Sequence, residues 1–77
     1  MMTKFQQAKE RADILEEVVN SMTWTKENTE ANIKNWKEKV ENAEEGEDIS
    51  WETDNIERYE FRLSVIQEVE RMLEKML

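Results

Sequence analysis

The sequence predicts an all-α protein, an antiparallel up-down-up bundle of three helices with a long third helix. Three observations indicate this class. The chain of 77 residues has no proline and a single glycine, so little interrupts a helical pattern. Apolar residues recur at alternating steps of four and three residues in three separate segments, which places them along one helix face. The short connections between these segments favour antiparallel neighbours. We expect residues 1–77 to form one small helical domain.

The first helix is expected over residues 3–21. Ile14 and Val18 widen its apolar stripe on one side. Asn20, Ser21 and Thr23 favour its end, because such side chains compete for backbone hydrogen bonds. The stripe itself consists of Met1, Phe5, Ala8, Ala12, Leu15, Val19 and Met22.

The second helix is expected over residues 25–45, with Thr23 or Thr25 as its N-cap. Its apolar arc is narrow, so it should pack on one side only. Gly46 suits a left-handed residue that terminates this helix. The arc consists of Thr29, Ile33, Trp36, Val40 and Ala43.

The third helix is expected over residues 50–77, with Ser50 as its N-cap. Its apolar stripe is broad, because Phe61, Val65 and Met72 extend it, so it must contact more than one neighbour. Two helices of the same chain or a second copy would both satisfy this requirement. At ~1.5 Å per residue it is the longest helix. Its last two turns either overhang the bundle or fray and fold back on the N-terminal residues, and the sequence favours neither. The stripe consists of Ile56, Tyr59, Leu63, Ile66, Val69, Leu73, Met76 and Leu77.

The net charge of −8 lies entirely within residues 38–60, where ten acids accompany two bases. The segments before and after are each neutral. In an antiparallel bundle, the end of the second helix, the following loop and the start of the third helix lie at one end. The acids should therefore form one surface, which we call the acidic pole and define as Glu41, Glu44, Glu45, Glu47, Asp48, Glu52, Asp54 and Glu57.

Part of the acidic pole is expected to be electrostatically unfavourable. Glu41, Glu44 and Glu45 would lie in the final turns of the second helix, where each opposes the helix dipole at a cost of about 0.3–1 kcal/mol at low salt. Such uncompensated arrangements often mark functional sites. The alternative is a solvated face that only keeps the protein soluble.

The three tryptophans are expected to have mainly structural roles. Trp36 belongs to the core stripe of the second helix, whereas Trp24 and Trp51 lie at helix starts, where a ring can cover the end of the bundle. Trp51 also emerges among the acids. An exposed Trp51 would combine an apolar anchor with electrostatic steering of a partner.

The composition argues against several function classes. The chain has no histidine and no cysteine, which removes the commonest general base and the commonest metal ligands, and no hydroxyl nucleophile has a base beside it. A calcium loop centred on Gly46 would place Ala43 at a ligand position, so we expect no metal site, no cofactor and no enzymatic activity. The acidic balance argues against direct binding to nucleic acid or membrane. With no signal peptide or membrane span, the chain is expected in the cytoplasm.

The most economical function is protein binding, with the acidic pole and Trp51 docked on a basic surface. Proteins with large basic surfaces often handle nucleic acid. Carboxylates one helical turn apart, about 5.4 Å, approach the spacing of phosphates. We therefore expect a nucleic-acid mimic that inhibits a nuclease, a restriction or CRISPR effector or another DNA- or RNA-binding protein, similar in size and charge to small phage anti-defence proteins.

The alternative is a structural or adaptor module that forms a homodimer through the third helix. In this case the acids only keep the protein soluble. The dimer contacts would then be Phe61, Val65, Met72, Met76 and Leu77.

Overall fold

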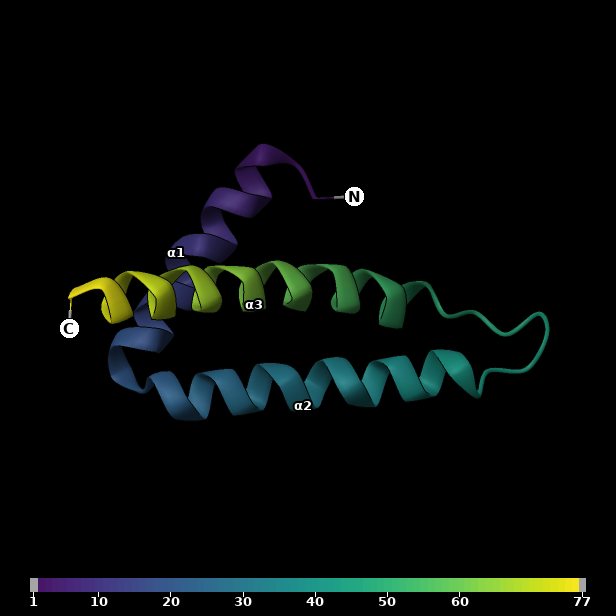
Figure 1. Cartoon of the computed structure of the whole chain (residues 1–77). Coiled ribbons are helices and arrows are strands. Elements are labelled where there is room, and N and C mark those ends of the chain that lie inside the picture. Colours follow the sequence, from purple (N-terminus) through teal and green to yellow (C-terminus); the bar gives the residue numbers. More distant parts are fainter. Residues whose placement is uncertain (1, 77) are drawn as a thin grey trace.

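The computed structural model describes residues 2–76, which form the helices α1 (Lys4–Asn20), α2 (Met22–Glu41) and α3 (Ser50–Met76) without any strand (Figure 1). The predicted all-α class with three helices is confirmed. Met1 and Leu77, which the sequence assigned to the first stripe and to a dimer contact, lie outside the described residues.

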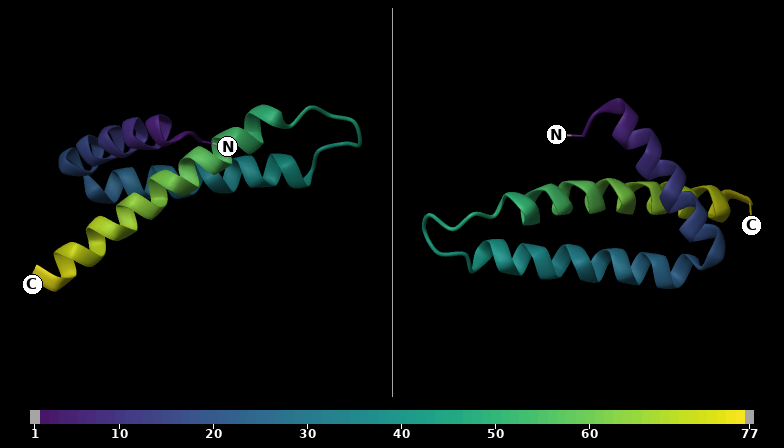
Figure 2. Two further views of the ribbon diagram at one scale, coloured as in Figure 1. Left: turned by 90° about the horizontal axis from the view of Figure 1, so that it is seen from above. Right: turned by 180° about the vertical axis from the view of Figure 1, so that it is seen from behind.

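The helices α2 and α3 run side by side in opposite directions (Figure 1). Ion pairs join them at two levels, Lys26 to Glu70 at 2.9 Å and Lys37 to Glu60 at 3.3 Å. The helix α1 crosses the back of this pair obliquely (Figure 2, right). The C-terminal end of α3 projects beyond both other helices, which is one of the two arrangements that the sequence left open (Figure 2, left). The molecule is therefore elongated, with extents of 49 × 25 × 19 Å.

A single residue, Ser21, connects α1 to α2. Its backbone is extended at φ −163°, and its N–H donates to the Glu17 carbonyl at 2.9 Å, which closes α1. Its hydroxyl accepts a hydrogen bond from the Trp24 N–H at 3.3 Å, which caps α2. Our assignment of the cap to Thr23 or Thr25 is therefore wrong, because Ser21 already supplies the acceptor and α2 begins earlier. Thr25 is buried and donates its hydroxyl to the Glu17 carbonyl at 3.1 Å.

The core lies where α1 and α3 cross. Ile14 and Val18 of α1 pack with Val65 and Ile66 of α3, and all four are buried. Val65 is only 1% exposed, which corrects its assignment to a dimer contact. Phe61 also packs against this cluster and is partly buried.

Only part of the predicted stripe of the first helix packs against the core, namely Leu15 and Met22, which are partly buried. Phe5 is 80% and Val19 is 85% exposed, and Ala8 and Ala12 are exposed as well. The buried face is instead the one that carries Ile14 and Val18. The same face also carries Glu10 and Glu17, which pair with arginines of α3.

Those pairs converge on Arg62, which is only 6% exposed. Its guanidinium donates to the Glu10 carboxylate at 2.9 Å and also to Glu17, so one side chain of α3 binds two positions of α1. It also lies over the Tyr59 ring, 5.2 Å from the ring centroid. Arg58 reaches the other oxygen of Glu10 at 2.9 Å. A charge this buried is tolerable only when it is paired in this way.

The Glu10 carboxylate remains ionised despite its partial burial. Burial raises its pKa, but hydrogen bonds from Arg62 and Arg58 and the positive charges of both outweigh this effect and hold the pKa of Glu10 below its ordinary value. Its side chain is 12% exposed, so the contact is well shielded from solvent.

We expect Arg62→Ala to unfold the protein or nearly so. Removing one partner of a buried ion pair costs roughly 3–5 kcal/mol, which is as large as the stability of about 3–5 kcal/mol that a domain of this size usually reaches. Circular dichroism during thermal unfolding measures this effect. Arg71→Ala is the control, because Arg71 is exposed and donates only to the Gln67 carbonyl. Equal stability of the two variants would contradict the central role of Arg62.

We expect Glu10→Gln to flatten the acid dependence of stability. The folded chain lowers the pKa of Glu10 from 4.5, so its stabilisation is present above that pH and is lost as the pH falls through the lower folded value. Urea unfolding at a series of pH values should therefore show a smaller loss of stability for the variant than for the wild type as the pH is lowered below 4.5. Glu16→Gln, at an exposed position without an ion pair among the described residues, should retain the wild-type slope. Parallel curves for Glu10→Gln and the wild type would refute the contribution of Glu10.

Candidate binding site at the acidic pole

The helix α2 ends at Glu41, four residues before the predicted end, and Asn42 is its C-cap. A longer helix would place further glutamates at turn spacing against the negative end of the dipole. Ending at Glu41 avoids this cost, and Lys39 offsets the charge in the last turn. Our expectation that Glu44 and Glu45 oppose the dipole of this helix is therefore wrong, because both lie in the loop.

The loop is closed by a tight turn at its centre. The Glu47 N–H donates to the Glu44 carbonyl at 3.0 Å, and Gly46 between them has φ +86°. A positive φ at the third residue of a turn favours glycine. Gly46 therefore shapes the loop and does not terminate α2, which corrects our prediction. The Glu47 carboxylate accepts the Glu44 N–H at 3.1 Å and closes the turn from the other side.

The start of α3 is held by Asp48. Its Oδ1 accepts the Ser50 N–H at 3.0 Å and the Ser50 hydroxyl at 2.7 Å. Ser50 is thus the first helical residue and a donor, and the predicted role of its side chain as N-cap acceptor is wrong. These hydrogen bonds, the hydroxyl first, lower the pKa of Asp48. A carboxylate at this position also complements the positive end of the α3 dipole.

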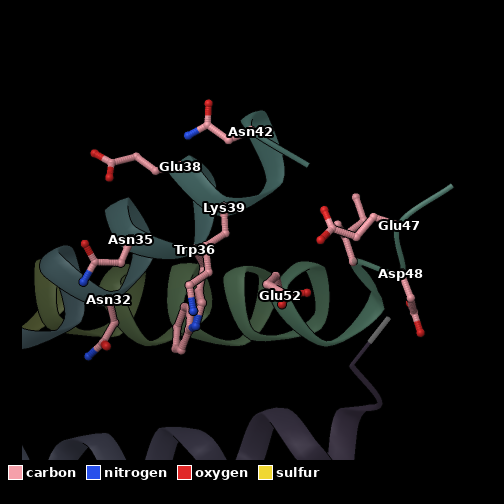
Figure 3. Close-up of a pocket in the computed structure, with 10 residues that line it drawn as sticks. Asn32, Asn35, Trp36, Glu38, Lys39, Asn42, Glu47, Asp48 and Glu52 are labelled. Atoms are coloured by element: carbon pink, nitrogen blue, oxygen red, sulfur yellow. The ribbon is translucent and has the colours of Figure 1, made fainter. Parts of the chain in front are cut away.

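A polar cleft of about 640 Å³ lies between the end of α2, the loop and the start of α3 (Figure 3). Four of its lining residues are acids and only Lys39 is a base. The complete lining is Asn32, Asn35, Trp36, Glu38, Lys39, Asn42, Glu47, Asp48, Ile49 and Glu52. The cleft is therefore suited to a positively charged group with several hydrogen-bond donors.

Glu52 is the cleft residue with an unmet requirement. Its Oε2 atom is buried and has no hydrogen-bond partner. A buried carboxylate oxygen without a donor costs free energy. Figure 3 shows Glu52 on α3 beside the ring of Trp36.

The aromatic residues form one connected group next to the cleft. Trp36 packs edge-to-face against Tyr59 at 4.8 Å and against Trp51 at 5.8 Å between ring centroids. Trp36 is half-buried, so it is only partly a core residue. Trp51 is 61% exposed although one edge is fixed by Trp36, and Trp24 is similarly exposed at the start of α2. Neither Trp24 nor Trp51 is covered to the extent that a purely structural role requires. Trp51 is thus an oriented, accessible apolar surface beside the acids.

The structure divides the acidic pole into groups. Glu47, Asp48 and Glu52 line the polar cleft, whereas Glu44 and Glu45 are exposed on the loop.

The remaining acids lie elsewhere. Asp54 and Glu57 line a second hollow of about 400 Å³ against α1, where Glu57 accepts the Met2 N–H at 3.1 Å. Glu41 lines a third hollow together with Lys34 and Lys37.

The sequence reasoning missed several cleft residues, Glu38 above all. Asn32, Asn35 and Asn42 were missed as well. A signal was present, because these asparagines and Lys39 follow steps of three, four and three residues, a polar stripe that runs beside the apolar stripe of α2. The charge pattern alone does not reveal this stripe, because asparagine is uncharged.

Comparisons with known protein families, with curated proteins and with solved structures find nothing that matches this chain. Within residues 2–76, no helix is sufficiently long and apolar to cross a membrane. In the same part of the chain, no group of three or more carboxylates is arranged to hold a metal ion.

We expect Asp48→Ala to destabilise the protein by about 1 kcal/mol, the usual cost of losing a side chain that caps a helix start. Chemical unfolding measures this difference. Glu45→Ala is the matched control, since Glu45 lies in the same loop, is exposed and has no hydrogen bond or ion pair within residues 2–76. A neutral result for Asp48→Ala would contradict its role at the start of α3.

Proposed function

We propose that this protein is a non-enzymatic binding module that docks its acidic pole on a basic surface of a nucleic-acid-handling protein and competes there with nucleic acid. One observation carries the proposal. Every ion pair formed between residues 2 and 76 uses an acid outside residues 41–54. The pairs are Arg11–Glu68, Lys26–Glu70, Lys37–Glu60, Arg58–Glu10, Arg62–Glu10 and Arg62–Glu17. The acids of residues 41–54 thus form no ion pair within the described part of the chain and are available to an external cation.

The cleft supports the same conclusion at the level of single groups. A lysine or arginine from a partner would find the acids Glu38, Glu47, Asp48 and Glu52 in the lining of the cleft. An ammonium or guanidinium supplies donors only, which matches a site rich in acceptors. Trp51 beside the cleft offers apolar contact area and a ring face for cation–π contact.

The distribution of the carboxylates changes how nucleic acid would be mimicked. Because α2 ends at Glu41, the acids do not form a ladder along one helix. They occupy a helix end, a loop and a helix start, and present charge over a rounded surface. Such a surface steers a basic partner over long range and blocks its binding groove. We place this interaction in the cytoplasm, with a nuclease, a restriction or CRISPR effector or another DNA- or RNA-binding protein as the class of target.

The test is affinity capture from the source organism on the immobilised wild-type protein. We expect a captured protein that is released by double-stranded DNA or by RNA, and whose binding weakens steeply as salt is raised. Capture by Glu44→Lys/Glu45→Lys should be weaker by about tenfold or more, because rim charges govern association.

The matched control is Asp13→Lys/Glu27→Lys, which changes the net charge by the same amount at exposed residues far from the loop in sequence. It should capture the partner as the wild type does. A partner that binds both double variants equally would refute docking through the acidic pole. A partner that nucleic acid does not displace would refute mimicry.

A further inference from the structure

The helix α1 carries two apolar faces and uses only one of them inside the chain. Ile14 and Val18 face α3, where they are buried. On another side of α1 lies the outer stripe, which we define as Phe5, Ala8, Ala12 and Val19, all exposed. Leu15 follows the same spacing at the edge of this stripe and is partly buried. The steps of three, four and three from Phe5 to Leu15, with four more to Val19, are those of a coiled-coil seam.

The exposed area of this elongated chain leaves enough surface for an interface with a partner. A folded monomer of 9.3 kDa exposes about 5,000 Å². This chain exposes 6046 Å². The surplus of about 1,000 Å² is close to the ~800 Å² that each partner contributes to a standard protein interface.

We propose that the outer stripe is the contact between two copies of this chain, which pack α1 against α1 in antiparallel orientation about a two-fold axis near Ala12. The inference is independent of the acidic pole, because none of its acids belongs to α1.

A second copy suits the stripe because the stripe is complementary to itself. A two-fold axis requires the same patch on both partners. With the axis near Ala12, the large Phe5 at one end meets Val19 of the second copy at the other end. The small side chains of Ala8 and Ala12 then lie in the middle, where they allow the two helices to approach closely.

The flanking charges select the antiparallel orientation. Lys9 and Glu16 lie along the same edge of the outer stripe, both are exposed, and neither forms an ion pair within residues 2–76. Antiparallel packing places Lys9 of each copy opposite Glu16 of the other. Parallel packing would instead bring Lys9 close to Lys4 of the second copy, and Arg11 would not help, because Glu68 holds it at 3.0 Å.

A second group of exposed apolar residues, on α3, can be compared with the outer stripe of α1. Met72, Leu73 and Met76 at the overhanging end of α3 are also exposed, and the sequence had favoured this helix for dimerisation. These residues form a patch of barely more than one turn, whereas the outer stripe runs along most of α1. We therefore assign the dimer contact to α1.

Sedimentation equilibrium of the wild-type protein tests the assignment. At high micromolar concentration we expect a mass of twice 9.3 kDa. Phe5→Ser/Val19→Ser should raise the dimer dissociation constant by at least tenfold with unchanged helicity, because both residues are exposed within the chain. Met72→Ser/Met76→Ser should leave the dimer unchanged. A monomeric wild type, or a dimer lost only in the second variant, would overturn the proposal.

Disulfide trapping tests the orientation, since the chain has no cysteine of its own. A mixture of Phe5→Cys and Val19→Cys proteins should form crosslinked pairs between the two variants under mild oxidation. Each variant alone should crosslink poorly. Efficient crosslinking of Phe5→Cys with itself would indicate a parallel pair and would contradict the antiparallel arrangement.

Discussion

The position of α1 depends on the contact of the buried Arg62 with Glu10 and Glu17. The apolar core between α1 and α3 is small, and four residues form its buried part. Hydrophobic contact alone would allow α1 to rotate, because its other side offers an apolar stripe of similar length. The arginine removes this freedom, since only one rotation of α1 brings both glutamates to it. The ion pairs thus contribute less to the free energy of folding than to deciding which of the two apolar faces of α1 packs against α3.

The choice between the two faces of α1 explains which features of the fold can be predicted from the sequence and which cannot. The helix class and the narrow arc of α2 follow from spacing, and Thr29 and Ile33 are buried as expected. The face of α1 does not follow from spacing, because Phe5 and Val19 fit the apolar pattern better than Ile14 and Val18 do. The deciding contacts join residues 45 or more positions apart, and a one-dimensional pattern does not contain them.

The acidic pole, too, can be predicted from the sequence only in part. Its place at one end of the molecule follows from topology, but its internal order depends on hydrogen bonds to the backbone. The carboxylates of Asp48 and Glu47 are engaged in shaping the loop, whereas those of Glu44 and Glu45 are not. The sequence treated these acids as equivalent because charge is visible in it and hydrogen-bond partners are not. The cleft between α2 and α3 likewise required the three-dimensional position of the asparagines.

The shared cap at Ser21 has a mechanical consequence. A longer linker would let α1 change its angle to α2 independently. Here Ser21 is both the C-cap of α1 and the N-cap of α2, so no further residue separates the two helices. The buried Thr25 hydroxyl adds a second bond from α2 back to the end of α1. A force applied to α1 by another molecule is therefore transmitted into the first turn of α2, and only fraying of a helix end would absorb it. The helices α1 and α2 therefore move as one unit, which is bent at Ser21.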